Sequence, residues 1–216
     1  MEFVKNNLGV IGRGAAKGPL ERLLRSIDRL GESVEATTAA MQTLSLWQVV
    51  ILVTCVEAYL QDVLIAAARI DPVYMKTSEQ QAQYSDVIQA PSLDVLANDL
   101  RARWARNWLN NGGPATWIER LNKMGARGYP AGLGAKLEVI WGIRHVIVHT
   151  AGVATTDFVR RHPGVVKAVG DRIILKRREI VQYFELVEDF LSPTDRYFIA
   201  RHPKMRAGAE GSNPTS

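Results

Sequence analysis

The sequence predicts a mainly α-helical fold, an up-and-down helical bundle with one small β-hairpin, from two observations. Apolar residues recur at intervals of three and four over most of the chain, as in Leu20, Leu23, Ile27 and Leu30. Only one short segment carries the strand-turn-strand pattern of a hairpin. With 216 residues, one domain is the default, and we place it at residues 19–202.

Both ends of the chain are expected to lie outside this domain. Residues 1–18 contain four glycines but lack the Gly-Lys-Ser/Thr ending of a phosphate loop, so a flexible arm is predicted. Residues 203–216 are predicted to be a disordered tail. Pro19 is expected to begin the first helix, because its missing N–H costs nothing in the first turn. The apolar spacing continues roughly to Met41.

The stretch from Leu44 to Ala68 is expected to form the most buried helix, at the centre of the bundle, and to end before Asp71-Pro72. Its most apolar run, residues 49–56, has eight residues, whereas a membrane span needs about 20. We therefore expect no membrane segment and a cytoplasmic protein. Cys55 is the chain's one cysteine, which fits a reducing compartment and a buried structural thiol.

A further helix is predicted after Ser92, which can cap it, while the polar residues 77–90 form a loop or a weak helix. Trp104 and Trp108 follow at helical spacing. Aromatic side chains interleaved with arginines can bind single-stranded RNA; the alternative is two core tryptophans and a solvated basic face. The arginines concerned are Arg101, Arg103 and Arg106.

The second half is expected to contain two more long helices. After a short helix at 116–123 and a glycine-rich loop at 125–134, a helix is predicted to stop at Ala151-Gly152. Farther on, the pair Gly170-Asp171 separates two apolar segments and predicts the β-hairpin, over residues 165–175.

The final amphipathic helix is predicted over residues 178–191. Pro193 is expected to end it, and a separate short helix then runs to Ala200.

The candidate catalytic residues are Arg144, His145 and His149, in the segment before the helix stop. Cleavage of RNA needs a base for the 2′-hydroxyl, an acid for the leaving 5′-oxygen and a cation on the phosphate. His149 supplies an imidazole that titrates near neutral pH. Arg144 can grip the phosphorane oxygens in a bidentate manner. The net charge of +5 is compatible with a polyanionic partner.

Other interpretations of this segment remain open. On an ideal helix, residues seven and eleven apart lie within about 20° of each other, so Glu138, His145 and His149 share one stripe. Cations also suit the negative end of a helix dipole. His145 and His149 have the spacing of a zinc half-site, but no further His or Cys motif accompanies them. We expect no metal and no cofactor, and assign no role to His162 or His202.

The pattern of Arg144, His145 and, four residues later, His149 resembles the HEPN domains (higher eukaryotes and prokaryotes nucleotide-binding). In that family the pattern lies at the end of the last long bundle helix, and the residue after the arginine is most often asparagine. Here that residue is His145.

A second segment carries the same resemblance. Residues 53–64 resemble the helix with a central glutamate and an aromatic residue that many HEPN members have, here Glu57 and Tyr59. The resemblance covers roughly residues 19–191.

The resemblance implies a metal-independent endoribonuclease that leaves a 2′,3′-cyclic phosphate, and that serves as a toxin or a prokaryotic defence effector. It implies a homodimer in which two Arg/His sets share one cleft, RNA as substrate, and an antitoxin or other inhibitory protein as a further partner. The alternative is an inactive HEPN dimer that binds RNA, a signal or a partner. Residues expected to support the site or bind substrate are Glu138, Glu57, Tyr59, Arg127 and Tyr129.

Overall fold

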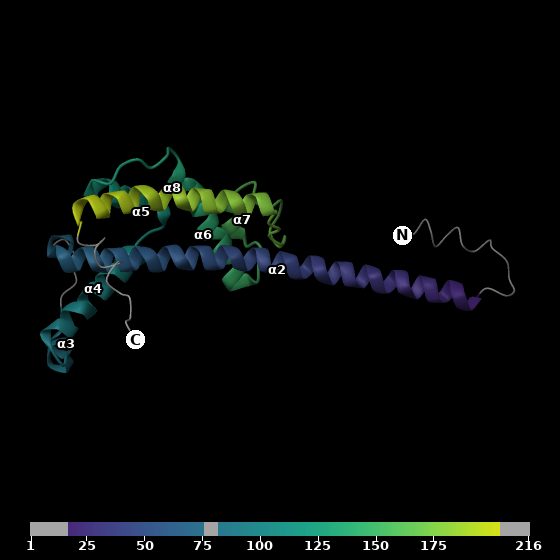
Figure 1. Ribbon diagram of the computed structural model, residues 1–216, viewed down its shortest axis with the longest axis horizontal. Coiled ribbons are helices and arrows are strands. Elements are labelled where there is room, and N and C mark those ends of the chain that lie inside the picture. The colour runs from purple at the N-terminus through teal and green to yellow at the C-terminus, as the bar shows by residue number, and fades with distance from the viewer. Residues whose placement is uncertain (1–16, 76–81, 204–216) are drawn as a thin grey trace, which may run out of the picture. The chain divides into compact units, whose positions relative to one another are not determined.

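The computed structural model describes residues 17–75 and 82–203, and these residues are mostly helical (Figure 1). The predicted α-helical class is therefore confirmed. Most of the expected N-terminal arm and C-terminal tail lies outside the described residues.

The chain divides into two compact units, Met1–Thr43 and Leu44–Ser216, where we expected one domain over residues 19–202. The described part of the first unit is helical throughout. The second unit holds the hydrophobic core and every candidate site residue.

Helix α2 (Lys17–Ile70) is one continuous helix where the sequence led us to expect two. No glycine or proline lies between Gly31 and Pro72, so nothing in the chain interrupts the backbone hydrogen bonds. The helix ends just before Asp71-Pro72, as predicted, because a residue preceding proline is disfavoured in helical conformation.

Short connections join the remaining helices. Ser92 caps α4 as predicted, its hydroxyl accepting a hydrogen bond from the Val95 N–H at 3.3 Å. Gly125 ends α5 in the left-handed conformation, with φ of 112°. The short helix α3 lies where we expected a loop or a weak helix. The short helix α7 lies where we expected no helix. The elements are η2 (Pro72–Met75), α3 (Tyr84–Gln89), α4 (Leu93–Asn110), α5 (Pro114–Met124), α6 (Leu133–Thr150), α7 (Thr156–Arg161) and α8 (Arg177–Arg201).

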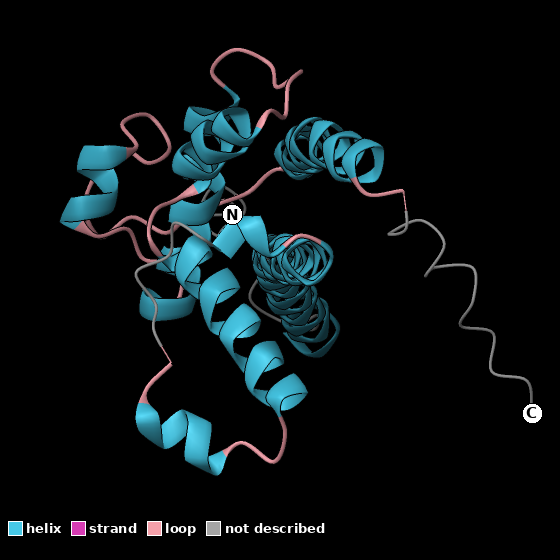
Figure 2. Cartoon of the chain, turned by 90° about the vertical axis from the view of Figure 1, so that its left-hand side faces the viewer, coloured by secondary structure: helices cyan, strands magenta, loops and turns pink. Residues whose placement is uncertain are grey.

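The predicted β-hairpin at residues 165–175 does not form, and Figure 2 shows only helices and loops in the described residues. The chain does turn at Gly170-Asp171, but its backbone pairs with the segment that follows α6. Ala154 N–H donates to the Asp171 carbonyl at 2.8 Å, and Ile173 N–H donates to the Gly152 carbonyl at 2.9 Å. A contact distant in sequence has replaced the local one.

Pro193 does not end α8, contrary to the prediction. Phe190, three residues before it, and Phe198, five residues after it, are 0% and 1% exposed. Burial of apolar side chains on both sides holds the helix on the core and offsets the one backbone hydrogen bond that proline removes.

The core of the second unit forms where α6 packs against α5 and α8. Helix α2 contributes a fully buried row to this core, including Val53, Leu60 and Leu64. In Figure 1, α8 runs beside this part of α2 and in the same direction. The tyrosine of α2 at position 59 contacts α8 at Asp195, which ties the two helices together.

The opposite side of α2 is more exposed than its apolar sequence predicted. Trp47 and Ile51 are 54% and 59% exposed, and Cys55 is exposed where we expected a buried thiol. By length and composition, the part of α2 from Asp28 to Ile70 is apolar enough to cross a membrane, which our count of one apolar run did not anticipate. Core helices of soluble proteins meet the same criteria.

Candidate functional site

Helix α6 carries the three candidate catalytic residues at its C-terminal end. One side of the helix is anchored in the core by six buried apolar side chains. The helix ends at Ala151, whose φ of 51° is left-handed, and the Gly152 N–H closes the end by donating to the Val146 carbonyl at 3.1 Å. The stop predicted from Ala151-Gly152 is therefore confirmed. The buried residues are Leu133, Leu137, Ile140, Ile143, Val146 and Ile147.

His145 and His149 lie side by side on the outer surface of α6. Both are exposed, and their ring centroids are 4.4 Å apart with the planes inclined at 45°. Residues four apart on a helix are surface neighbours, so the spacing seen in the sequence brings the rings together. Neither imidazole has a hydrogen-bond partner among the described residues, so both keep their ring nitrogens available to a ligand or to water.

Arg144 points to a different side of the helix. Five residues on an ideal helix correspond to about 140° of rotation, so Arg144 and His149 of one chain face well apart. Its Nε atom is buried and has no hydrogen-bond partner in the described part of the chain. A buried guanidinium N–H without a partner is costly.

Glu138 lies on the histidine stripe but is engaged elsewhere. Its Oε1 accepts a hydrogen bond from the Ala115 N–H, at 3.2 Å, at the start of α5. The carboxylate occupies the space beside Gly113, where a Cβ would come within 2.3 Å of Oε1. Glu138 therefore caps the N-terminus of α5, where a negative charge is favourable. That role is structural, and it separates Glu138 from the two histidines.

His162, to which the sequence assigned nothing, lies against the same stripe of α6. A Cβ on Gly142 would be 2.4 Å from His162 Nε2, so the ring rests directly on this glycine. Gly142 follows Glu138 by four residues and precedes His145 by three. Burial lowers the pKa of His162, as does Arg161, while the charges of Glu138 and Asp157 oppose the shift. In the sequence, only the glycine at position 142, which leaves room for a neighbouring side chain, could have indicated this contact.

Glu57 is partly buried and binds a tryptophan of α6. Its Oε1 accepts a hydrogen bond from the indole Nε1–H of Trp141, at 2.9 Å. The same indole packs edge-on against Trp117, with ring centroids 5.4 Å apart. Glu57 thus joins α2 to the middle of α6 and fixes Trp141, which lies between the directions of Arg144 and His145 around the helix.

Both tyrosines that we expected to support the site contact neighbouring residues of α8 and do not contact the histidines. The Tyr59 hydroxyl donates to Asp195, and the Tyr129 hydroxyl bonds to Thr194 Oγ1 at 3.0 Å. Burial is the main cause that raises the pKa of each tyrosine, and Asp195 adds to the shift at Tyr59. These contacts hold the loop before α6 against α8.

Arg127, also expected near the site, closes the end of α5. Its Nη1 donates to the carbonyl of Ala126 at 2.8 Å and to that of Asn122. Its guanidinium is thus committed to backbone carbonyls left unpaired at a helix end.

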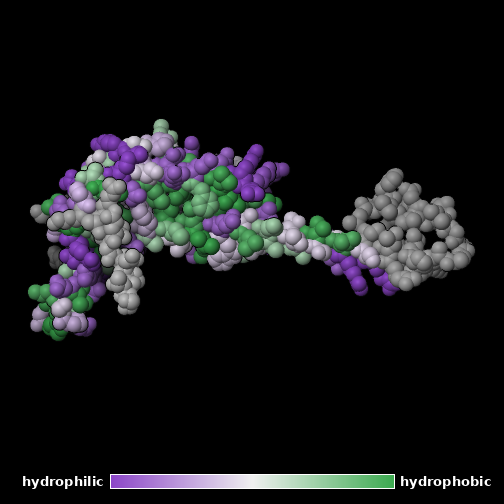
Figure 3. All heavy atoms as spheres, viewed as in Figure 1, coloured by the Kyte–Doolittle hydropathy of each residue, from purple (hydrophilic) through white to green (hydrophobic). Residues whose placement is uncertain are grey.

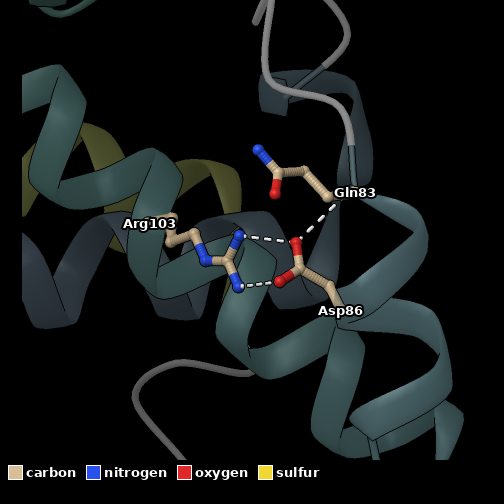
Figure 4. Close-up of polar contacts among 3 residues, drawn as sticks. All are labelled: Gln83, Asp86 and Arg103. Carbon is tan, nitrogen blue, oxygen red and sulfur yellow. Dashed lines mark hydrogen bonds and ion pairs between the residues drawn. The ribbon is translucent and has the colours of Figure 1, made fainter.

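The arginine face of α4 is partly committed as well. Figure 4 shows Arg103 gripping both carboxylate oxygens of Asp86, at 2.7 and 3.0 Å. Asp86 also accepts from the Gln83 N–H at 3.1 Å, and Arg103 holds its pKa below the usual range. Trp104 is 6% exposed and belongs to the core. This face therefore fits the structural alternative better than a stacking platform for RNA.

No group of three or more His, Cys, Asp or Glu side chains converges as a metal site within residues 17–75 and 82–203. The zinc half-site formed by His145 and His149 lacks its third member, because Glu138 is held at α5.

Comparisons of the chain with protein-family models, curated proteins and solved structures give no significant match.

Proposed function

We propose that this chain is a metal-independent endoribonuclease of HEPN type, with Arg144 and His149 as its catalytic residues. The observation that carries the proposal is the paired, exposed imidazoles of His145 and His149 at the end of α6. Arg144 belongs to the same end of α6 but faces another side, and its Nε has no protein partner among the described residues. Two imidazole rings and a guanidinium at one helix end are the groups that phosphodiester cleavage needs.

Each side chain has a defined task in this reaction. His149 removes the proton of the 2′-hydroxyl or protonates the leaving 5′-oxygen, because an imidazole can do either near neutral pH. Arg144 binds the phosphorane oxygens, whose charge grows in the transition state. His145, where the HEPN pattern most often has asparagine, orients the phosphate or acts as the second imidazole. The products are a 2′,3′-cyclic phosphate and a free 5′-hydroxyl.

A second copy of the chain supplies what one α6 lacks. The rotation of about 140° between Arg144 and His149 keeps them from one phosphate within a single copy. Two α6 ends facing each other would place Arg144 of one copy beside His149 of the other. The proposed enzyme is therefore a homodimer with a composite site, in the cytoplasm, as a toxin or defence effector held by an inhibitory protein.

A dimer that binds RNA or a partner protein without cleaving it is the second candidate. The same separation of Arg144 from His149 favours it, as does the departure from asparagine at His145. The nuclease and the binding dimer would use the same surface, and they differ only in whether the bound RNA is cleaved.

The discriminating experiment uses the purified chain, an RNA oligonucleotide and its all-deoxy counterpart, each with and without EDTA. The enzyme proposal predicts cleavage of the RNA alone, unaffected by EDTA, with cyclic phosphate ends. Activity that EDTA abolishes, or equal cleavage of the DNA, contradicts it. Binding of RNA without products favours the second candidate.

A mixing experiment tests the composite site. Arg144→Ala and His149→Ala proteins, each inactive alone, should regain activity when unfolded together and refolded, because mixed dimers contain one intact Arg/His set. Two inactive proteins that stay inactive after mixing, with mixed dimers demonstrated by mass, contradict a site shared between copies.

A further inference from the structure

Helix α2 carries a second pattern that the proposed function does not use. Residues at alternating intervals of four and three from Leu30 to Ala58 form one lengthwise stripe, here called the α2 stripe. Such a seven-residue repeat of apolar positions is typical of helices that pair as coiled coils. The stripe spans about four heptads, which is enough to be informative. Its large apolar members are Leu30, Val34, Met41, Leu44 and Ile51.

All positions of the α2 stripe are exposed in the structure. In the first unit, Leu30 and Val34 are each 65% exposed and Met41 is 63% exposed. In the second unit, Leu44 and Ile51 are 61% and 59% exposed. Large apolar side chains in a regular row, uncovered within the chain, mark an interaction surface.

Charged side chains avoid this stripe. Between Arg25 and Ala58, every charged residue occupies one of the three heptad positions farthest from the stripe. The positions beside the stripe in the first unit are small and uncharged, such as Ser33 and Ala40. Figure 3 shows hydrophobic and hydrophilic side chains on opposite sides of this part of α2. The charged residues are Arg25, Asp28, Arg29, Glu32, Glu35 and Glu57.

In the second unit, the side of α2 opposite the stripe is buried and apolar, whereas in the first unit it is charged. The heptad positions that hold charges in the first unit hold core residues here, among them Val49, Val53 and Val56, which are at most 2% exposed. Among the described side chains of α2, the stripe is thus the side that is both apolar and exposed in each unit. Packing within the chain explains the buried side but leaves the stripe without a partner among the described residues.

We infer that the α2 stripe pairs with the same stripe of a second copy of this chain, as a two-helix coiled coil. Two uncharged stripes meet without repulsion. In a parallel, in-register pair, the polar members Thr37 and Gln48 each face their own counterpart. In an antiparallel pair centred between Gln42 and Thr43, Thr37 faces Gln48 of the other copy. In that antiparallel register each large apolar member of the stripe from Val34 to Ile51 also faces another apolar member. The stripe is therefore complementary to itself, which favours a second copy of the chain as the occupant.

Pairing also explains why the first unit is helical. An isolated helix is marginal in water, and most helical stability in proteins comes from packing of an apolar face. In the described part of the first unit, the large apolar side chains of the stripe are exposed, so this face of the helix is not packed. This inference does not depend on the nuclease proposal.

Disulfide trapping in the full-length protein tests the pairing, with Cys55, the chain's one cysteine and a member of the stripe, as the probe. A disulfide requires Cα atoms within about 7 Å. A parallel pair brings the two copies of Cys55 together, so mild oxidation should give a covalent dimer of the native protein. An antiparallel pair brings position 30 opposite Cys55, so the covalent dimer should form in a Leu30→Cys variant instead.

Matched variants decide whether the stripe causes the trapping. Val34→Glu with Met41→Glu places two charges on the stripe and should abolish the covalent dimer. Ala36→Glu with Ala39→Glu adds the same charges to the opposite side of the same turns and should leave it unchanged. Circular dichroism checks that both double variants remain helical.

The inference is overturned if neither the native protein nor the Leu30→Cys variant forms a covalent dimer. It is also overturned if Val34→Glu with Met41→Glu forms this dimer to the same extent as Ala36→Glu with Ala39→Glu. Absence of trapping, together with binding to lipid vesicles that Val34→Glu with Met41→Glu removes, would assign the stripe to a membrane surface instead. No RNA enters these measurements, so a chain without nuclease activity would leave the pairing standing, and the reverse holds too.

Discussion

The imidazole rings of His145 and His149 lie 4.4 Å apart, centroid to centroid, on the last two turns of α6. Both rings are exposed, whereas Glu138, two turns earlier on the same stripe, is tied to the start of α5. The chemistry that α6 can offer is therefore confined to its C-terminal end.

The role of His145 can be separated from that of His149. His145→Asn should lower the rate of RNA cleavage less than His149→Ala does, because asparagine keeps a hydrogen-bond donor and is the common residue at this position of the HEPN pattern. The measurement is a rate comparison at equal protein concentration. If His145→Asn is as damaging as His149→Ala, His145 itself transfers a proton.

The hydrogen bond between Glu57 and Trp141 should contribute measurably to stability. Glu57→Ala leaves the indole N–H without its acceptor, and we expect a loss of about 1–3 kcal/mol in the free energy of unfolding. Glu57→Gln retains an acceptor oxygen and should lose much less. Urea unfolding followed by tryptophan fluorescence measures both variants. Equal losses would show that the charge of Glu57, and not the hydrogen bond, matters.

The contact between His162 and Gly142 should appear as a coupling energy. Gly142→Ala alone brings a Cβ within 2.4 Å of His162 Nε2 if nothing moves, so it should be neutral or destabilising. In a His162→Ala background the same change should stabilise the protein by roughly 0.5–1 kcal/mol, because alanine is the better helix former. A double-mutant cycle by chemical unfolding tests this. Additive effects would mean that the two residues do not touch.

His162 should also make stability depend on pH. Its pKa is lowered in the folded protein, chiefly by burial, so the unfolded chain takes up the proton first as pH falls. The stabilisation is complete above the ordinary histidine pKa of about 6.5 and is lost as pH falls through the lower folded pKa. His162→Asn should therefore flatten the fall of the melting temperature between neutral and mildly acidic pH. Parallel slopes for the two proteins would exclude this histidine as the cause.

Local signals in the sequence predicted the helix ends well. Pro72 and Ser92 act through backbone geometry and capping, which need only a few neighbouring residues. The two expected helices join into α2 because no glycine or proline lies between Gly31 and Pro72. Helix α8 continues through Pro193 because apolar side chains of the helix are buried in the core on both sides of the proline. The hairpin failed for a related reason: the turn at Gly170 is real, but its backbone pairs with residues 152–154.

In the candidate site, too, contacts within one helix could be predicted from the sequence and contacts between helices could not. His145 and His149 could be placed together because their contact lies within one helix. The partners of Glu138, Tyr59 and Tyr129 come from other helices, and spacing along the chain carries no information about them. His162 was missed because it reaches α6 from the end of α7.

The rate of RNA cleavage in EDTA by the wild-type protein and by His149→Ala shows whether this histidine takes part in catalysis. Val148→Ala, an exposed neighbour on the same turn, serves as the matched control, and circular dichroism confirms folding. We expect His149→Ala to lower the rate by about 10²–10⁴, the usual contribution of a general acid or base, and Val148→Ala to leave it unchanged. Wild-type activity in a folded His149→Ala protein would exclude His149 from the catalytic step.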